Sequence, residues 1–285
     1  MESNVILVTG ATGRQGGATA QELLARGHLV SAMTRKPGSE AARRLADLGA
    51  TIVQGDLDDR ASLDRALEGV WGVFALQNTW EAGVEREEEQ GKRLAEAAKA
   101  AGVQHFVYSS VASAHRKTGI PHFENKWRIE ETVRGLDFPS HVIIRPVFFM
   151  ENLLGPRFKP GIDAGRLTVA IRPDTPLQMI AVEDIGKYTR LAFEPHDELN
   201  GREIDIAGDE KTMPEAAEIL SDELGRKVTF DPPPIEEVRK TSEDFAIMLE
   251  WFDRVGYDAD IEGNARQFDI EPTSFADWVS KANWD

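Results

Sequence analysis

Three glycines spaced three residues apart provide the first chemical clue in this sequence. Gly10, Gly13 and Gly16 follow the apolar run 5–8 and precede a helical pattern. Between a strand and a helix, such glycines allow in turn a tight bend, close approach of a pyrophosphate and close packing of the helix. The helix N-terminus adds N–H groups and a positive dipole end. The pattern therefore predicts a dinucleotide site, although a purely structural turn would have the same composition.

The end of the second predicted strand indicates which dinucleotide binds. Thr34, Arg35 and Lys36 supply a hydroxyl and two cations there, and the sequence has no carboxylate at this turn. Arg35 lies 19 positions after Gly16. At about this spacing an acidic residue selects NAD, whereas an arginine accommodates the 2′-phosphate of NADP. The sequence therefore favours NADP(H) over NAD(H).

Composition narrows the classes of function. The 285 residues include 49 acidic and 33 basic ones, and the net charge of −16 disfavours direct binding to nucleic acid or membranes. The absence of cysteine excludes disulfides and thiolate chemistry, and the six histidines show no metal-ligand spacing. No run approaches the roughly 20 apolar residues of a membrane span, and no signal peptide is evident, so we expect a cytoplasmic protein.

Alternating strands and helices position these residues. Short β-branched runs alternate with helical patterns in the first half, which predicts a parallel sheet with helices on both faces. The expected strands are 5–9, 28–33, 51–54, 70–76, 104–109 and 141–145, and the expected helices are 16–26, 39–48, 60–68, 84–101 and 123–134. The predicted fold class is α/β, a Rossmann-type doubly wound parallel sheet, with an NADP-binding domain over residues 1–150.

In the second half of the chain, the regular alternation of strands and helices gives way to shorter elements. Prolines and glycines cluster at 153–165, a strand is expected at 203–207, and a capping box begins a helix over 212–224. Two further helical stretches follow the prolines of the DPPP sequence. We therefore expect residues 151–285 to form a smaller C-terminal α/β lobe that binds a substrate or partner and returns in part to the sheet.

Several other motifs occur together and in a fixed order. They are TRKP, GDLDD at 55–59, FVYSS at 106–110, PHFENKWRIEE at 121–131 and RPVFFMENLL at 145–154. Together with the glycine turn, they resemble the NmrA-like family of atypical short-chain dehydrogenases/reductases, which includes a human NADPH-sensor-like member. The resemblance covers most of the chain.

The resemblance implies a set of cofactor contacts at the strand ends. Taken in sequence order, the residues of this set would contact the pyrophosphate, the 2′-phosphate and the adenine, then line the cofactor cleft, and then contact the nicotinamide ribose. The last ones would contact the nicotinamide through their backbone. The members of the set are Gly10, Thr12, Gly13, Arg14, Gln15, Gly16, Thr34, Arg35, Lys36, Asp56, Leu57, Gln77, Asn78, Lys126, Val147 and Phe148. Two have simpler alternatives, since Asp56 could be a turn or capping aspartate and Lys126 a solvated helix lysine.

The candidate catalytic residues, His122 and Lys126, depart from the pattern of catalytic short-chain dehydrogenases. Those enzymes usually carry Tyr-x-x-x-Lys, in which the lysine lowers the pKa of the tyrosine, but His122 stands at the tyrosine position here. The serine of extended members falls at Val111. Histidines ordinarily have a pKa near 6.5, which suits proton transfer near neutrality, although a structural histidine is an equal alternative.

Two functions follow from these observations. The first is an NADP(H)-binding redox sensor or regulator, with a regulatory protein as partner and a homodimer as one arrangement. The alternative is an NADPH-dependent oxidoreductase that reduces a small quinone, carbonyl or imine. A nucleotide-sugar epimerase is discounted because its tyrosine and serine are absent. We expect 148–150 to line a substrate pocket or join the core, and the acidic helix 85–101 to present a solvated face.

Overall fold

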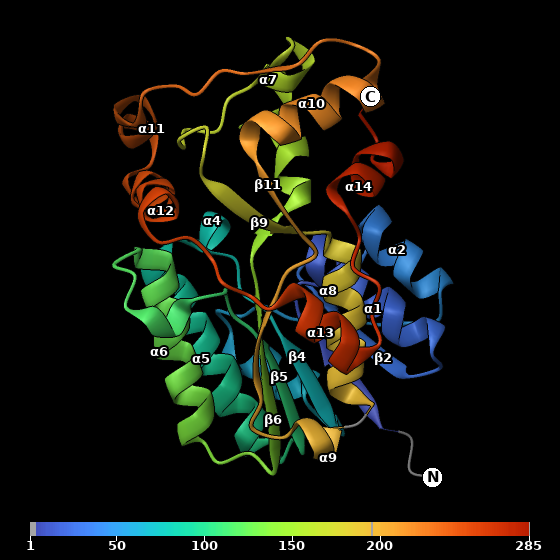
Figure 1. Cartoon of the computed structure of the whole chain (residues 1–285). Helices are drawn as coiled ribbons and strands as arrows, with labels where there is room; N and C mark the ends of the chain where they lie inside the picture. Colours follow the sequence, from blue (N-terminus) through green and yellow to red (C-terminus); the bar gives the residue numbers. More distant parts are fainter. Residues whose placement is uncertain (1–3, 195, 285) are drawn as a thin grey trace.

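A seven-stranded parallel sheet forms the centre of the computed structural model, which describes residues 4–194 and 196–284 (Figure 1). Its strand order is β3-β2-β1-β4-β5-β6-β10. The strands are β1 Val5–Val8, β2 Leu29–Thr34, β3 Thr51–Gln54, β4 Gly72–Ala75, β5 His105–Ser109, β6 Ser140–Pro146 and β10 Glu203–Ile206. The first six have the order of the doubly wound dinucleotide-binding fold, and β10 adds an edge. The predicted fold class is confirmed.

Helices cover both faces of this sheet, as Figure 1 shows. One face packs against α1 Arg14–Ala25, α2 Glu40–Asp47 and α8 Val182–Phe193, and the other against α3 Arg60–Ala66, α5 Val84–Ala100 and α6 Pro121–Gly135. Because side chains alternate along a strand, Ile6 and Val8 enter the first core and Leu7 enters the second. The predicted helix boundaries are within two residues of these, and α1 and α6 each begin two residues earlier than expected.

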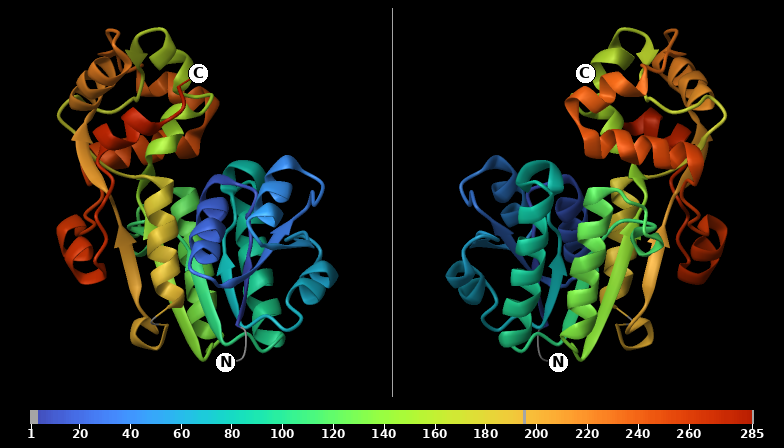
Figure 2. Two further views of the ribbon diagram at one scale, coloured as in Figure 1. Left: turned by 90° about the vertical axis from the view of Figure 1, so that its right-hand side faces the viewer. Right: turned by 90° about the vertical axis from the view of Figure 1, so that its left-hand side faces the viewer.

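A smaller lobe lies above the carboxyl ends of the strands (Figure 2). It contains the strand set β11-β9-β7 and the pair β12-β8. These strands are β7 Phe148–Phe149, β8 Arg166–Leu167, β9 Pro176–Ile180, β11 Asp209–Thr212 and β12 Thr229–Phe230. The capping box at Thr212 is present, with Glu215 closing it at the start of α10.

Helices of the lobe enclose a separate apolar core. They are η2 Met150–Leu154, α7 Lys159–Asp163, α10 Met213–Leu224, α11 Ile235–Thr241, α12 Glu243–Arg254 and α14 Phe275–Lys281. The remaining short elements are η1 Ala114–Arg116, α4 Thr79–Ala82, α9 His196–Leu199 and α13 Ile261–Phe268. Within residues 4–194 and 196–284, no helix is both long and apolar enough to cross a membrane.

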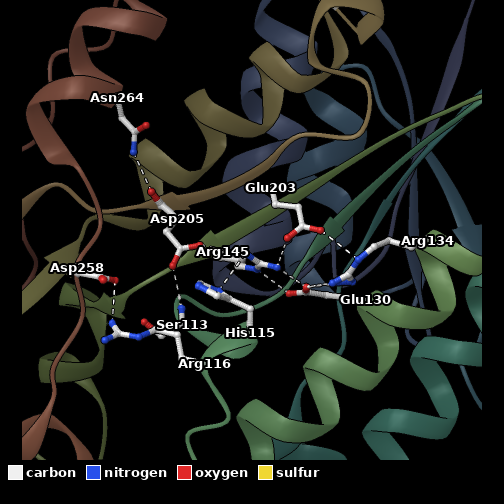
Figure 3. Close-up of polar contacts among 10 residues, drawn as sticks. All are labelled: Ser113, His115, Arg116, Glu130, Arg134, Arg145, Glu203, Asp205, Asp258 and Asn264. Carbon is white, nitrogen blue, oxygen red and sulfur yellow. Dashed lines mark hydrogen bonds and ion pairs between the residues drawn. The ribbon is translucent and has the colours of Figure 1, made fainter.

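A buried ion-pair network joins the edge strand β10 to β6 and α6 (Figure 3). Arg145 contacts Glu130 at 2.6 Å, Glu203 at 2.5 Å and Asp205 at 3.5 Å. Burial opposes the charge of Arg145, but these carboxylates outweigh it and raise the pKa of its guanidinium. Asp205 also accepts a hydrogen bond from the backbone N–H of Ser113 at 2.9 Å. The network therefore fixes the segment that leads into α6.

Candidate functional site

The predicted cofactor residues all lie beyond the carboxyl ends of neighbouring parallel strands or on the helices that follow them. The glycine turn follows β1, residues 34–36 end β2, 56–57 follow β3, 77–78 follow β4, and 147–148 follow β6. His122 and Lys126 lie on α6, which follows β5. Ligands of open parallel sheets bind at this edge. The structure thus brings the predicted set to one side of the sheet, and its contacts with a cofactor stay a prediction.

The glycine turn has geometric reasons for its composition. Gly10 adopts φ +60°, a left-handed conformation that favours glycine, and Gly13 N donates to Gly10 O at 2.9 Å. A Cβ at Gly16 would lie 2.3 Å from Gly10 O, so this position excludes any side chain. The first turn of α1 has neither a side-chain cap nor an acidic residue. Its N-terminus therefore suits an anionic group.

Thr12, Arg14 and Gln15 connect this turn to its neighbours. The Thr12 hydroxyl lies 3.4 Å from the Thr34 hydroxyl of β2. Arg14 Nη1 donates to the carbonyl oxygen of Glu151 at 2.8 Å, and Gln15 Nε2 donates to the Ser109 hydroxyl of β5. These contacts span β2, β5 and the smaller lobe, so the turn is held on three sides.

The basic residues at the end of β2 differ in their contacts. Lys36 N donates to the Thr34 hydroxyl at 3.1 Å. Arg35 is exposed and forms an ion pair with Glu81 of α4. The hydrogen bond that Arg35 donates to this carboxylate raises the pKa of its guanidinium. Nothing in the sequence pairs these residues, because they are 46 positions apart.

Asp56 and Leu57 form a turn after β3. Asp56 Oδ1 accepts a hydrogen bond from Asp58 N at 3.0 Å, and Leu57 O accepts one from Arg93 Nη1 at 2.8 Å. The turn role that we considered for Asp56 is therefore present. A contact between this turn and adenine stays a prediction.

Buried polar atoms without partners gather beyond β4 and β5. Gln77 is 3% exposed, and neither its amide nitrogen nor its amide oxygen has a hydrogen-bond partner among the described residues. The hydroxyls of Thr79 and Ser110 are likewise unpartnered within the described part of the chain. Each such group costs about 1–3 kcal/mol unless something satisfies it. A polar ligand with amide and hydroxyl groups, such as a nicotinamide riboside unit, fits these atoms.

Asn78 has a different role from its neighbour Gln77. Its Oδ1 accepts a hydrogen bond from Trp80 N at 3.1 Å and caps α4. This short helix carries Glu81, the partner of Arg35. Asn78 therefore orders the segment beside the site, whether or not its side chain touches a ligand.

Lys126 is a buried member of a charged cluster. Its Nζ lies 3.0 Å from Glu87 Oε1 and 5.8 Å from the centre of the Tyr108 ring. Asn125 Nδ2 donates to Glu87 Oε2 at 2.9 Å. The alternative of a solvated lysine is therefore wrong.

The expectation that the acidic residues of α5 form a solvated face is also wrong at one position. Glu87 is fully buried. It belongs to the inward face of the helix, with spacing of three and four residues that the sequence already contains: Glu87, Gln90, Gly91, Leu94 and Ala98. The position of Glu87 on the apolar face of the helix was therefore the signal that this acid is buried. The composition of the charged segment as a whole did not carry that signal.

Tyr108 does not replace the missing tyrosine of the family pattern. It lies in β5, is fully buried, and its hydroxyl has no hydrogen-bond partner among the described residues. Burial, followed by the charge of Glu87, raises its pKa well above the ordinary value. A catalytic tyrosine needs a lowered pKa, so Tyr108 does not meet this requirement.

His122 forms a pair with an acid from the smaller lobe. Its backbone N–H donates to Asp244 Oδ2 at 2.9 Å, and its Nδ1 is bonded to Asp244 Oδ1. Trp80 packs on the imidazole, with ring centres 5.2 Å apart. With Nδ1 held by a carboxylate, Nε2 is the nitrogen available for proton exchange. Asp244 lies 122 positions away, so sequence reasoning missed it.

Val147 and Phe148 lie where β6 passes into the lobe. Val147 N donates to Ile206 O at 3.2 Å. Phe148 and Met150 are buried in the core of the lobe, as one of the two alternatives expected, whereas Phe149 is only partly buried. The Phe148 ring meets that of Phe158 at 6.3 Å between centres.

Comparisons with known proteins agree with this geometry. The model of the NmrA-like family matches residues 2–279. A (4-alkanoyl-5-oxo-2,5-dihydrofuran-3-yl)methyl phosphate reductase from Streptomyces griseus is 32% identical, covering 82% of this chain and 79% of its own. An NADPH-dependent quinone oxidoreductase from Escherichia coli, complexed with NADPH, has a TM-score of 0.82 at 22% identity and covers 97% and 98% of the two chains. The negative transcriptional regulator NmrA, in complex with NADP, has a TM-score of 0.79 at 22% identity and covers 99% and 96%.

Proposed function

We propose that this chain, which belongs to the NmrA-like family, is an NADPH-dependent oxidoreductase that reduces a small quinone, carbonyl or imine compound. The observation that carries the proposal is the pair of His122 on α6 with Asp244 on α12, beside strand ends where Gln77 and Ser110 are buried without partners among the described residues. A proton donor and polar ligand-binding groups at the same edge of the sheet would suit reduction of a small acceptor. The named activities of the reductase and the quinone oxidoreductase support the same class.

Residues of the glycine turn and of β2 would hold the cofactor. The N-terminus of α1 offers backbone N–H groups to the pyrophosphate, and Arg35 with Lys36 offers positive charge to the 2′-phosphate. Gln77 would exchange hydrogen bonds with the carboxamide, which satisfies both of its amide atoms. NADP(H) is thus the cofactor we assign.

The chain's own residues would handle the proton. NADPH, when bound, supplies the hydride. His122, as the imidazolium, would donate the Nε2 proton to the oxygen or nitrogen that becomes negative and would be left neutral, while Asp244 fixes the ring through Nδ1 and stabilises the cationic donor form. Lys126 would bind the ribose hydroxyls, and Glu87 holds its ammonium group in place.

The test is consumption of NADPH with a panel of quinones, aldehydes, ketones and imines. His122→Ala and Asp244→Asn are compared with the native chain, and His141→Ala, a partly buried histidine of β6, is the matched control. Removal of a general acid costs about a hundred- to ten-thousandfold in rate. Carbonyl and imine reduction should fall by this factor in the first two variants only. Quinone reduction should fall less, because solvent can protonate the product.

A redox regulator is the second candidate, and the raised pKa values of all three tyrosines, Tyr108, Tyr188 and Tyr257, favour it. The regulator NmrA shares the fold. In that case the chain would bind NADPH tightly, reduce no acceptor in the panel, and act through a regulatory protein. Turnover that is indifferent to His122→Ala would retain an enzyme and remove the histidine from its mechanism.

A further inference from the structure

A cavity of about 200 Å³ lies in the smaller lobe, between the segment before α7 and the helices α11 and α12. Phe158, Phe245 and Leu249 form apolar parts of its wall, and Thr168 and Thr241 add hydroxyls. A cavity of about 150 Å³ is large enough for benzene. This one therefore has room for a single ring with a substituent.

Arg157, an exposed residue, brings a positive charge to the rim of this cavity. Its guanidinium lies 4.3 Å from the centre of the Phe245 ring. No acidic side chain of the described residues pairs with it, and burial alone acts on its pKa, which it lowers. The acid in the cavity wall, Glu237, already pairs with Lys240 at 2.6 Å. Because no acid of the described residues occupies the exposed guanidinium of Arg157, an anionic ligand in the cavity can pair with it directly.

A series of aromatic contacts connects the cavity with the candidate site. Phe158 meets Phe148 on one side and Phe245 on the other, each with ring centres 6.3 Å apart. Phe245 meets Trp80 at 5.9 Å, and Trp80 meets His122 at 5.2 Å. Phe245, in the cavity wall, is thus connected with His122 through the ring of Trp80.

We propose that this cavity is a substrate subsite for an aromatic ring that carries an anionic group, a carboxylate, sulfonate or phosphate. The proposal rests on the oxidoreductase function and names its substrate class. Arg157 pairs with the anion while its guanidinium stays stacked on Phe245, and the ring of the substrate lies against Phe158 and Leu249. The reducible group of the same molecule extends toward His122.

Binding is measured first, without turnover. Calorimetry with benzenesulfonate, in the presence of excess NADP⁺, compares the native chain with Arg157→Met and Arg157→Lys. The control, Arg26→Met, removes an exposed charge at the end of α1. We expect Arg157→Met to weaken binding about tenfold, with Arg157→Lys intermediate and the control unchanged. Equal affinity in Arg157→Met and the native chain, or no binding by the native chain, would overturn the subsite.

Kinetics then separate the subsite from the proposed function. The acceptors are two naphthoquinones, one neutral and one with a sulfonate on the ring remote from the quinone. The native chain should have the lower KM for the sulfonate, and Arg157→Met should change the ratio of the two KM values about tenfold. An unchanged ratio would contradict the subsite. Absence of any quinone, carbonyl or imine reduction, alongside sulfonate binding that requires Arg157, would overturn the enzyme and leave the subsite standing.

Discussion

Two groups of buried polar residues in this molecule differ in how completely they are paired. In the network around Arg145, the fully buried Glu130 and two acids of β10 surround one guanidinium (Figure 3). Beyond β4 and β5, by contrast, Gln77 and Ser110 are buried with no partner among the described residues. Buried polar groups that have partners support the fold. Buried polar groups without partners cost stability, and they are retained where a ligand supplies the missing hydrogen bonds.

The pairing of the first group is built into the strand register. Asp205 of β10 stands directly opposite Arg145 of β6. Glu130 reaches the same guanidinium from α6, through two hydrogen bonds of 2.9 and 2.6 Å. The second group, Gln77 and Ser110, comes from the segments that follow β4 and β5. These segments lie beyond the paired residues of the two strands. The comparison predicts that substitutions in the two groups affect stability with opposite signs.

The largest effect is expected for Arg145→Met. This change leaves the carboxylate of Glu130 buried without its main partner, which costs about 3–5 kcal/mol in comparable buried pairs. Urea denaturation should show this loss in the free energy of unfolding. NADPH affinity, measured on the fraction that is folded, should change little. A loss below about 1 kcal/mol would mean that Arg134, which lies 3.1 Å from Glu130, replaces Arg145.

Arg35→Ala should affect binding more than stability. The Arg35–Glu81 pair is exposed, and exposed pairs contribute at most about 1 kcal/mol to folding. A charge-assisted bond to phosphate is stronger, so NADPH affinity should fall about ten- to a hundredfold while NADH affinity is nearly unchanged. Calorimetry with both cofactors measures this. Equal losses for both would remove Arg35 from the 2′-phosphate site.

Gln77→Leu tests the unsatisfied group directly. Leucine removes two polar atoms that lack partners, so the cofactor-free protein should become more stable by about 1 kcal/mol. NADPH affinity should fall about tenfold, since the leucine cannot exchange hydrogen bonds with the ligand. Urea denaturation and calorimetry on one variant give both numbers. A variant that is less stable and binds NADPH normally would reverse the interpretation of this group.

The sequence predicts the first half of the fold well, because short β-branched runs and the glycine turn are local signals. The helix start at Gly16 was wrong by two residues, since α1 already begins at Arg14 with Gly13 as its cap. Strand 203–207 was predicted as β10, but its place beside β6 depends on contacts that no local pattern specifies.

The sequence predicts where the residues of the candidate site lie, but it does not predict which residues pair with one another. Residues after successive strands were expected at one edge, since parallel strands end on the same side. The pairs that define their chemistry join distant segments: His122 with Asp244, Arg35 with Glu81, and Lys126 with Glu87. Each depends on tertiary packing. The buried Glu87 had a local signal in its helical spacing, whereas Asp244 had none.

The smallest expected effect concerns the pH dependence that Asp205 contributes. Burial raises the pKa of Asp205, and the backbone N–H of Ser113 and the charges of Arg145 and His115 only partly oppose this. The folded chain therefore holds this proton more tightly than the unfolded chain, in which aspartate has a pKa of about 3.9. The free energy of unfolding must then decrease as the pH rises from that value to the higher folded pKa.

Asp205→Asn removes this contribution and isolates it. The difference in free energy of unfolding between the native chain and the variant should be largest below about pH 3.9 and should shrink as the pH rises above that value, by about 1.4 kcal/mol for each unit by which the two pKa values differ. Urea denaturation at several pH values measures this difference. A difference that grows with pH would show that Arg145 stabilises the Asp205 carboxylate by more than its burial costs. Asp205 would then be more stable in its charged form in the folded chain. The network around Arg145 would differ even more clearly from the group of Gln77 and Ser110.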